Sequence, residues 1–158
     1  VLGVGQNFHE AMYKGFTAAG TTIPKAGSTI LVTVREMDKE NFLPIAKKFH
    51  ELGCKFIATA GTAKLLEDND IPVQVAKKIS EGVPNILDVI RSGMIDLIID
   101  IPKKGNDIHS DGFKIRRTAI ECDVSIMTSL DTVKALVDVM EHRYTPDTVD
   151  VISLSDIK

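Results

Sequence analysis

The spacing of apolar residues changes at residue 28. From there to residue 142, short apolar runs alternate with longer segments whose apolar residues recur every three or four positions. The short runs predict buried strands, and the periodic segments predict amphipathic helices. We expect strands at 29–34, 56–58, 72–76, 95–101 and 124–127, with helices at 38–52, 63–68, 84–92, 113–122 and 130–142. Residues 149–154 either add a final strand or pack as a tail.

Strands that alternate with helices are typical of parallel sheets with helices on both faces. The predicted fold is therefore α/β and three-layered, a Rossmann-like domain with a central parallel sheet of five strands. Pro72 opens the third strand, and a proline is tolerated where no ladder N–H is needed, so we expect that strand at an edge. Asp38 is a candidate N-cap, Pro84 lies near the first turn of its helix, and Gly93 ends that helix.

The beginning of the chain has a different organisation. Phe8 and Met12 fall at helical spacing behind Asn7, a candidate N-cap. Residues 21–27 contain proline and glycine and are typical of a linker. We therefore place a domain boundary after residue 27, so that the main domain spans 28–158.

The stretch 59–62, Thr-Ala-Gly-Thr, joins the second strand to the next helix. The first N–H groups of a helix have no intrahelical acceptor, and the peptide dipoles place partial positive charge there, so such a turn can bind an anion. Thr59 and Thr62 can donate hydrogen bonds to phosphate oxygens, and Gly61 lacks the Cβ that would hold a phosphate away. The alternative is that one of the two threonines only caps the helix.

Ligands of parallel sheets bind beyond the carboxyl ends of the strands. The loops that meet at this edge carry Lys39, Lys77, Lys78, Lys103 and Lys104. Together with the threonine turn, these lysines suit a phosphate or a nucleotide. The alternative is that they are solvated surface charges, as lysines in loops usually are.

Composition narrows the class of protein. The 158 residues are 44% apolar and 26% charged, which is ordinary for a globular chain. The net charge of −3 gives no sign of a nucleic-acid or membrane partner, and no apolar run is long enough to span a membrane. Cys54 and Cys122 lack metal-ligand spacing, so we expect reduced thiols in a cytoplasmic protein without a metal site. A chain that begins at Val1 suggests a piece of a longer protein.

Several motifs in a fixed order carry a resemblance to a known family. They are residues 1–5 (Val-Leu-Gly-Val-Gly), 32–39 (Val-Thr-Val-Arg-Glu-Met-Asp-Lys), 58–63 (Ala-Thr-Ala-Gly-Thr-Ala), Lys78 with 81–84, and 115–119 (Ile-Arg-Arg-Thr-Ala). Over almost the whole chain they resemble the methylglyoxal-synthase-like domain at the C-terminus of the carbamoyl-phosphate synthetase large subunit. Residues 1–27 resemble the end of the ATP-grasp unit that precedes that domain.

The resemblance implies a regulatory α/β domain that binds an allosteric effector. In that family UMP is the usual inhibitor, while IMP or phosphoribosyl pyrophosphate activates in some bacteria. It implies no catalytic residue and no cofactor in this domain, although the parent enzyme would use ATP and Mg in pyrimidine and arginine biosynthesis. The implied partners are the effector, the rest of the large subunit and the glutaminase small subunit, and self-association stays open.

The resemblance also implies site residues. The effector's phosphate is expected at Lys39, Thr59, Gly61, Thr62 and Lys78, with Thr33 behind them, and its nucleoside part at Asp100, Pro102 and Asp111. The chain departs from the family pattern in the second group. Asp100-Ile101-Pro102 stands where the family often has Asn-Thr-Thr, and one additional residue precedes Ile115.

An enzyme of the same fold, methylglyoxal synthase, is the main alternative. Removal of phosphate from dihydroxyacetone phosphate begins with abstraction of a carbon-bound proton, which requires a carboxylate base and a histidine. His109 lies in a fitting loop, but residues 80–84 replace the expected Gly-Gly-Asp-Gln-Gln, and no carboxylate base is matched. A dinucleotide-binding dehydrogenase is disfavoured, because Phe8 takes the third glycine position after Gly3-Val4-Gly5 and no strand precedes it.

Overall fold

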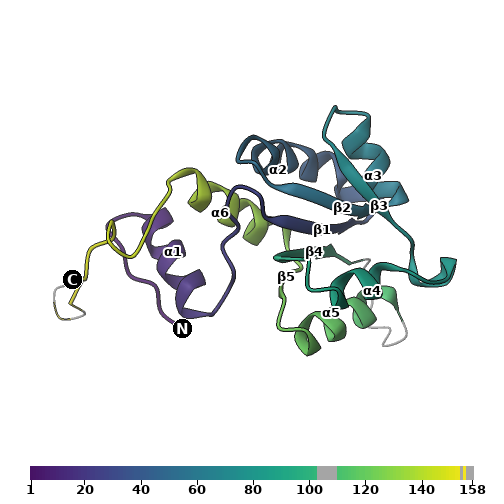
Figure 1. Ribbon diagram of the computed structural model, residues 1–158. Coiled ribbons are helices and arrows are strands. Elements are labelled where there is room, and N and C mark those ends of the chain that lie inside the picture. The colour runs from purple at the N-terminus through teal and green to yellow at the C-terminus, as the bar shows by residue number, and fades with distance from the viewer. Residues whose placement is uncertain (103–109, 154, 156–158) are drawn as a thin grey trace.

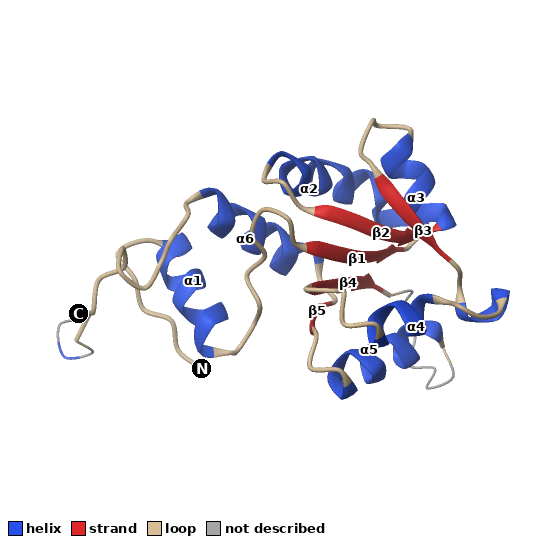
Figure 2. Ribbon diagram, viewed as in Figure 1, coloured by secondary structure: helices blue, strands red, loops and turns tan. Residues whose placement is uncertain are grey.

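The computed structural model describes residues 1–102, 110–153 and 155. Its centre is a sheet of five parallel strands in the order β3-β2-β1-β4-β5 (Figures 1 and 2). The strands are β1 (Thr29–Val34), β2 (Lys55–Thr59), β3 (Val73–Ala76), β4 (Leu97–Ile101) and β5 (Ser125–Met127). The predicted fold class, number of strands and edge position of β3 are confirmed. The strand order reverses between β1 and β4, which is where ligands of such sheets bind.

Helices cover both faces of the sheet (Figure 2). They are α2 (Lys39–Glu51), α3 (Ala60–Glu67), α4 (Ile86–Arg91), α5 (Asp111–Glu121) and α6 (Leu130–Glu141), with short 3-10 turns η1 (Glu36–Asp38) and η2 (Ile79–Glu81). Successive strand residues point to opposite faces. Ile30 and Val32 therefore join the core under α2, α3 and α6, whereas Leu31 joins the core under α4 and α5. Thr33 follows the alternation and lies on the α4–α5 face, level with Asp100 of β4.

Two helices begin earlier than predicted. α3 begins at Ala60, because Thr59 is still extended and the next residue is already helical. α5 begins at Asp111, and the side chain of Ser110 accepts a hydrogen bond from the Phe113 N–H at 3.2 Å. The loop predicted to reach residue 112 therefore ends two residues sooner.

The start of α4 differs from the prediction in the opposite direction. The helix begins at Ile86, after Asn85, whose side-chain oxygen accepts a hydrogen bond from the Leu87 N–H at 2.9 Å. The Asp88 carboxylate in turn accepts one from the Asn85 N–H at 2.8 Å. This reciprocal pair fixes the helix start. Pro84 consequently precedes the helix, and its predicted place in the first turn is wrong.

Asp38 occupies the N-cap position of α2, as predicted, but its side chain makes no capping hydrogen bond. The carboxylate instead accepts a hydrogen bond from the Arg35 guanidinium. The carboxylate that was expected to cap α2 is therefore paired with Arg35. The position was predicted correctly, and the capping interaction was not.

The first helix, α1 (Phe8–Ala18), packs beside α6 and the end of the chain (Figure 1). Asn7 caps α1 as predicted, since its side chain accepts a hydrogen bond from the Glu10 N–H at 3.0 Å. Residues 149–153 form no strand, and Leu154 lies outside the described residues. This segment packs as a tail, because the Asp150 N–H donates to Glu10 at 3.3 Å and the Lys14 ammonium donates to the Asp150 carbonyl. The boundary after residue 27 stays a prediction.

Three further sequence-based expectations concern the membrane, metals and cysteines. Within the described residues, no helix has both the length and the apolar character needed to cross a bilayer. No cluster of three or more histidine, cysteine, aspartate or glutamate side chains that could hold a metal ion occurs among them. Cys54 and Cys122 are free thiols, and burial, with a smaller contribution from Asp96, raises the pKa of Cys54 to about 11.

Candidate functional site

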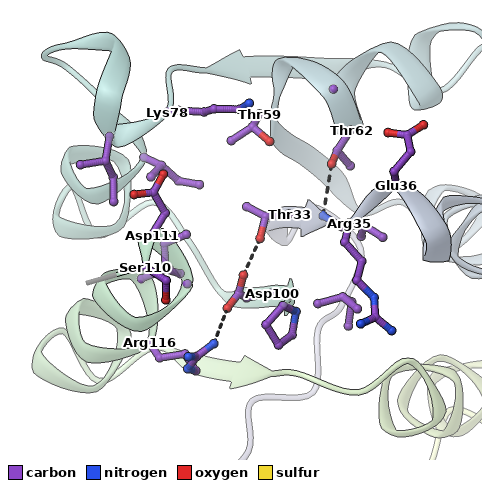
Figure 3. A pocket seen from close by; sticks show the side chains of 18 of the residues that line it. Thr33, Arg35, Glu36, Thr59, Thr62, Lys78, Asp100, Ser110, Asp111 and Arg116 are labelled. Carbon is purple, nitrogen blue, oxygen red and sulfur yellow. Dashed lines mark hydrogen bonds and ion pairs between the residues drawn. The ribbon is translucent and has the colours of Figure 1, made fainter. Parts of the chain in front are cut away.

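A cavity of about 580 Å³ opens at the carboxyl edge of the sheet, above β1, β2 and β4 (Figure 3). It is lined by all nine residues predicted for the effector site: Thr33, Lys39, Thr59, Gly61, Thr62, Lys78, Asp100, Pro102 and Asp111. Of the other predicted rim residues, Lys77 does not line the cavity. Lys103, Lys104 and His109 lie outside the described residues. The structure thus brings the predicted residues together, and their binding of an effector stays a prediction.

The N-terminus of α3 forms one side of the cavity. Thr59 occupies its N-cap position, yet the Thr59 side chain makes no capping hydrogen bond. Figure 3 shows the Thr59 hydroxyl pointing into the cavity, near the end of Lys78. Capping therefore does not explain this threonine. Its hydroxyl and the first N–H groups of α3 are available to an anion.

Thr62 has a structural as well as a candidate binding role. The residue is 2% exposed, and its hydroxyl oxygen accepts a hydrogen bond from the Val34 N–H at 3.2 Å. This bond ties the first turn of α3 to the end of β1. A hydroxyl that accepts one hydrogen bond can still donate its own proton. Thr62 is thus positioned by the fold beneath the anion site.

Two lysines bring positive charge to this side. A Cβ added to Gly61 would lie 3.6 Å from Lys39 Nζ, which places the Lys39 ammonium directly over the first turn of α3. Lys39 Nζ also lies 2.6 Å from a carboxylate oxygen of Glu36, whose side chain is 86% exposed. Lys78 is exposed and has no ion-pair partner among the described residues. An incoming anion would meet one free ammonium and one that is held only by a solvated glutamate.

Asp100 lies on the opposite side of the cavity, at the end of β4. Its side chain is 5% exposed and accepts hydrogen bonds from the Thr33 hydroxyl at 2.6 Å and from the Arg116 guanidinium at 3.0 Å (Figure 3). Burial raises the pKa of Asp100, while the hydrogen bond from Thr33 and the charge of Arg116 oppose that rise. The cavity therefore contains a buried carboxylate, held on both oxygens, which the sequence had not identified as such.

The cavity is also lined by residues that were not among the nine predicted site residues, although several lie in loops expected at this edge. They are Val34, Arg35, Glu36, Ile79, Ile86, Ile101, Ser110, Gly112, Ile115 and Arg116. Arg116 is the most informative of them, because it holds Asp100. The sequence signal that could have identified Arg116 is its place in the 115–119 motif, directly after the buried residue Ile115. Gly112 lies below it, and a Cβ there would come within 3.2 Å of both Arg116 and Asp100. A side chain at this position would therefore require Arg116 or Asp100 to shift by a few tenths of an ångström.

Comparisons with known proteins show the family to which the chain is related. The family model of the MGS-like domain matches residues 41–128. The carbamoyl phosphate synthase large chain of Clostridium botulinum (strain Loch Maree / Type A3) is 49% identical over 99% of this chain. That of Clostridium perfringens (strain 13 / Type A) is 46% identical over 98% of it. The chain spans only 15% and 14% of the length of these two relatives.

The fold has a counterpart among solved structures. Methylglyoxal synthase from Elizabethkingia anophelis NUHP1 superposes with a TM-score of 0.59 and 18% sequence identity, over 72% of this chain and 78% of that one. At this identity the likeness shows the shared fold and nothing about activity.

Proposed function

This chain belongs to the MGS-like domain family, and we propose that it is the regulatory domain of a carbamoyl phosphate synthase large chain that binds a phosphorylated effector in the cavity. The effector class is a nucleotide or phosphoribosyl compound such as UMP, IMP or phosphoribosyl pyrophosphate. The domain itself performs no catalysis in this proposal. Its partners are the rest of the large chain and a glutaminase subunit in a cytoplasmic ligase that uses ATP and Mg for pyrimidine and arginine biosynthesis.

One observation carries the proposal. The N-terminus of α3, which the Thr59 side chain does not cap, lines the same cavity as Lys39 and Lys78. Free helix N–H groups, a hydroxyl and lysine charges are the partners that phosphate monoesters take in proteins. Each charge-assisted hydrogen bond contributes about 1.5–3 kcal/mol, so a few of them are enough for specific binding.

The test is titration calorimetry of the purified chain with UMP, IMP and phosphoribosyl pyrophosphate. We expect at least one of them to bind, and Lys39→Ala to weaken that binding by about 1.5–3 kcal/mol. Lys47→Ala is the matched control, because Lys47 lies on the same helix, is exposed and does not line the cavity. Binding that is absent for all three compounds, or equal in the two variants, would contradict the proposal.

Methylglyoxal synthase activity is the second candidate, and Asp100 is the observation that favours it. A buried carboxylate with a raised pKa, beside a phosphate site, is a candidate general base. The hydrogen bonds from Thr33 and Arg116 occupy both of its oxygens, which lowers its capacity to take a proton from carbon. The regulatory proposal is therefore the better supported of the two.

A further inference from the structure

Asp100 is a buried carboxylate inside a cavity that is proposed to bind an anion. Its side chain is 5% exposed and lines the cavity at the end of β4, whereas the α3 N-terminus follows β2. β1 lies between these two strands, and neighbouring strands are about 4.8 Å apart, so ~10 Å separates the carboxylate from the proposed phosphate position. A bound phosphate therefore adds negative charge near a carboxylate that has little contact with solvent.

The charged residues around Asp100 do not remove this effect. The carboxylate has one guanidinium partner, Arg116, at 3.0 Å. The other charged residues that line the described part of the cavity come from the turn after β1 (Arg35 and Glu36), from α2 (Lys39), from the turn after β3 (Lys78) and from α5 (Asp111). All of these charges are present before and after binding. The charge that binding adds is therefore the anion's own.

The hydrogen bonds of Asp100 leave a place for a proton (Figure 3). The Arg116 guanidinium can only donate, so its bond to Oδ2, at 3.0 Å, favours an unprotonated Oδ2. The Thr33 hydroxyl donates to Oδ1 at 2.6 Å, and a hydroxyl can also accept. If Oδ1 takes up a proton, the Thr33 hydroxyl reverses and accepts a hydrogen bond from it. Protonation at Oδ1 therefore costs neither of the two hydrogen bonds.

Two effects of a bound anion favour the protonated form of Asp100. A like charge disfavours an ionised carboxylate, and a ligand that displaces water from the cavity withdraws solvation from the same group. Burial already raises the pKa of Asp100, against the hydrogen bond from Thr33 and the charge of Arg116. Binding of an anion acts in the same direction as burial.

Resting on the proposed function, we propose that binding of a phosphorylated effector in this cavity is linked to the uptake of a proton by Asp100. The proton comes from solvent and is held on Oδ1. A process that takes up a proton is favoured by acidification, so the affinity for the effector falls as the pH rises through the range in which Asp100 ionises. The site therefore responds to pH as well as to the effector, through a side chain on the opposite side of the cavity from the phosphate.

The experiment is titration calorimetry with UMP, IMP and phosphoribosyl pyrophosphate between pH 5 and pH 8. Each titration is repeated in two buffers of different ionisation enthalpy, which gives the number of protons taken up per effector bound. Asp100→Asn keeps the size of the side chain and removes the titrating group. We expect the parent to take up more protons than Asp100→Asn. The Kd of the parent, relative to that of the variant, should rise by about three- to tenfold across this pH range, which is the effect of adding like charge at ~10 Å.

Two controls isolate Asp100. The second ionisation of a phosphate monoester lies at about pH 6, within the same range, but it is common to all variants and cancels in their comparison. Asp68→Asn, at the exposed end of α3 away from the cavity, removes the same charge from the protein. This variant should take up as many protons as the parent.

The outcomes separate this inference from the proposed function. Equal proton uptake in the parent and Asp100→Asn, with a ratio of Kd values that does not change with pH, overturns the linkage and leaves the effector site intact. Proton release that depends on Asp100 also overturns it, because ligand donors would then stabilise the ionised carboxylate. No binding of any of the three compounds overturns both proposals.

Should Asp100→Asn fail to fold, as judged by circular dichroism, Arg116→Gln decides. Loss of the guanidinium removes a charge that stabilises the ionised form of Asp100, so the proton uptake should move to higher pH. Proton uptake over the same pH range in Arg116→Gln and the parent would overturn the linkage.

Discussion

The Thr62 hydroxyl oxygen lies 3.2 Å from the backbone nitrogen of Val34 and accepts its hydrogen bond. Thr62 belongs to α3 and Val34 ends β1, so this one bond joins the anion-binding turn to the central strand of the sheet. Both residues are buried. The α3 side of the cavity is therefore held in place by a side chain that also lines the cavity.

The first prediction follows from this bond. Thr62→Ala leaves a buried N–H without an acceptor, and we expect the free energy of unfolding to fall by about 1–3 kcal/mol. Thr62→Ser keeps the hydroxyl and should retain most of the stability. Thr59→Ala is the control, because the Thr59 side chain makes no capping hydrogen bond. Urea unfolding measures all three, and a Thr62→Ala variant as stable as the parent would contradict the structural role.

The second prediction concerns the ion pair between Glu36 and Lys39, at 2.6 Å. A bound phosphate must compete with the Glu36 carboxylate for the same ammonium. Glu36→Gln removes the competitor, and we expect it to tighten binding of a nucleoside monophosphate by a few-fold, since exposed ion pairs contribute at most about 1 kcal/mol.

Calorimetry at constant salt tests this expectation. Glu51→Gln, at the far end of α2, removes the same charge from the protein without touching the cavity and should leave the affinity unchanged. An affinity that falls in Glu36→Gln would show that Glu36 contributes to the site rather than competing for it.

The third prediction is a pH dependence of stability that originates at Asp100. Burial raises the pKa of Asp100 above its ordinary value of 3.8. The folded protein then holds this proton more tightly than the unfolded chain, so the contribution of Asp100 to stability falls as the pH rises from 3.8 through the raised pKa. In Asp100→Asn that fall should be absent.

Urea unfolding of both proteins between pH 4 and pH 8 measures the difference. We expect the stability of the parent, relative to Asp100→Asn, to decrease toward neutral pH. Arg116→Gln should steepen the decrease, because the guanidinium stabilises the ionised carboxylate. Parallel curves for the parent and Asp100→Asn would contradict the assignment. Asp111→Asn controls for a change of net charge.

The fourth prediction concerns the C-terminal tail. The buried Glu10 carboxylate pairs with Lys14 at 2.7 Å and accepts hydrogen bonds from the Gln6 N–H at 2.7 Å and from the Asp150 N–H at 3.3 Å. The hydrogen bond from Lys14, followed by that from Gln6, lowers the pKa of Glu10. Its stabilising effect is therefore present at neutral pH and is lost as the pH falls through the lowered pKa.

We expect Glu10→Ala to release the tail, with faster amide hydrogen exchange at residues 149–153. Glu67→Ala, exposed at the end of α3, is the control and should leave the exchange of the tail unchanged. Unaltered exchange in Glu10→Ala would mean that other contacts hold the tail.

The strands and the cavity were predictable because they follow from local patterns. The alternation through 29–34 predicts a buried strand, and the rule for parallel sheets brings the loops that follow the strands to one edge. The choice of Thr33 and Asp100 as site residues rested instead on the family resemblance. The contact between Asp100 and Arg116 was not predictable in this way. It depends on how α5 is rotated over the sheet, and residues 100 and 116 are joined by a loop whose path no periodicity defines.

The side-chain contacts of Asp38 and Thr62 were not predictable for a similar reason. Asp38 was predicted only as a capping residue, and the sequence pattern does not show which other group competes for its carboxylate. In the structure the Asp38 carboxylate forms an ion pair with the guanidinium of Arg35, three residues earlier. Thr62 is a second example. Nothing in the sequence around this threonine indicates that its hydroxyl accepts a hydrogen bond from Val34, a strand residue 28 positions earlier.

The last prediction separates a regulator from a phosphate-eliminating enzyme. Proton abstraction from dihydroxyacetone phosphate requires a sufficiently basic group within reach of the carbon-bound proton, and hydrogen bonds donated to an ionised carboxylate lower its basicity. Asp100 is the buried carboxylate that the described part of the cavity offers, and its two oxygens accept hydrogen bonds from Thr33 and Arg116. We therefore expect no release of inorganic phosphate from dihydroxyacetone phosphate above a protein-free control. The assay uses an excess of enzyme and runs for several hours. Thr33→Val would remove one of the hydrogen bonds that lower the pKa of Asp100, so the same assay on this variant tests whether that hydrogen bond alone suppresses turnover. Phosphate release by the parent that disappears in Asp100→Asn and persists in Asp68→Asn would identify Asp100 as a base. That result would replace the regulatory proposal with a catalytic one.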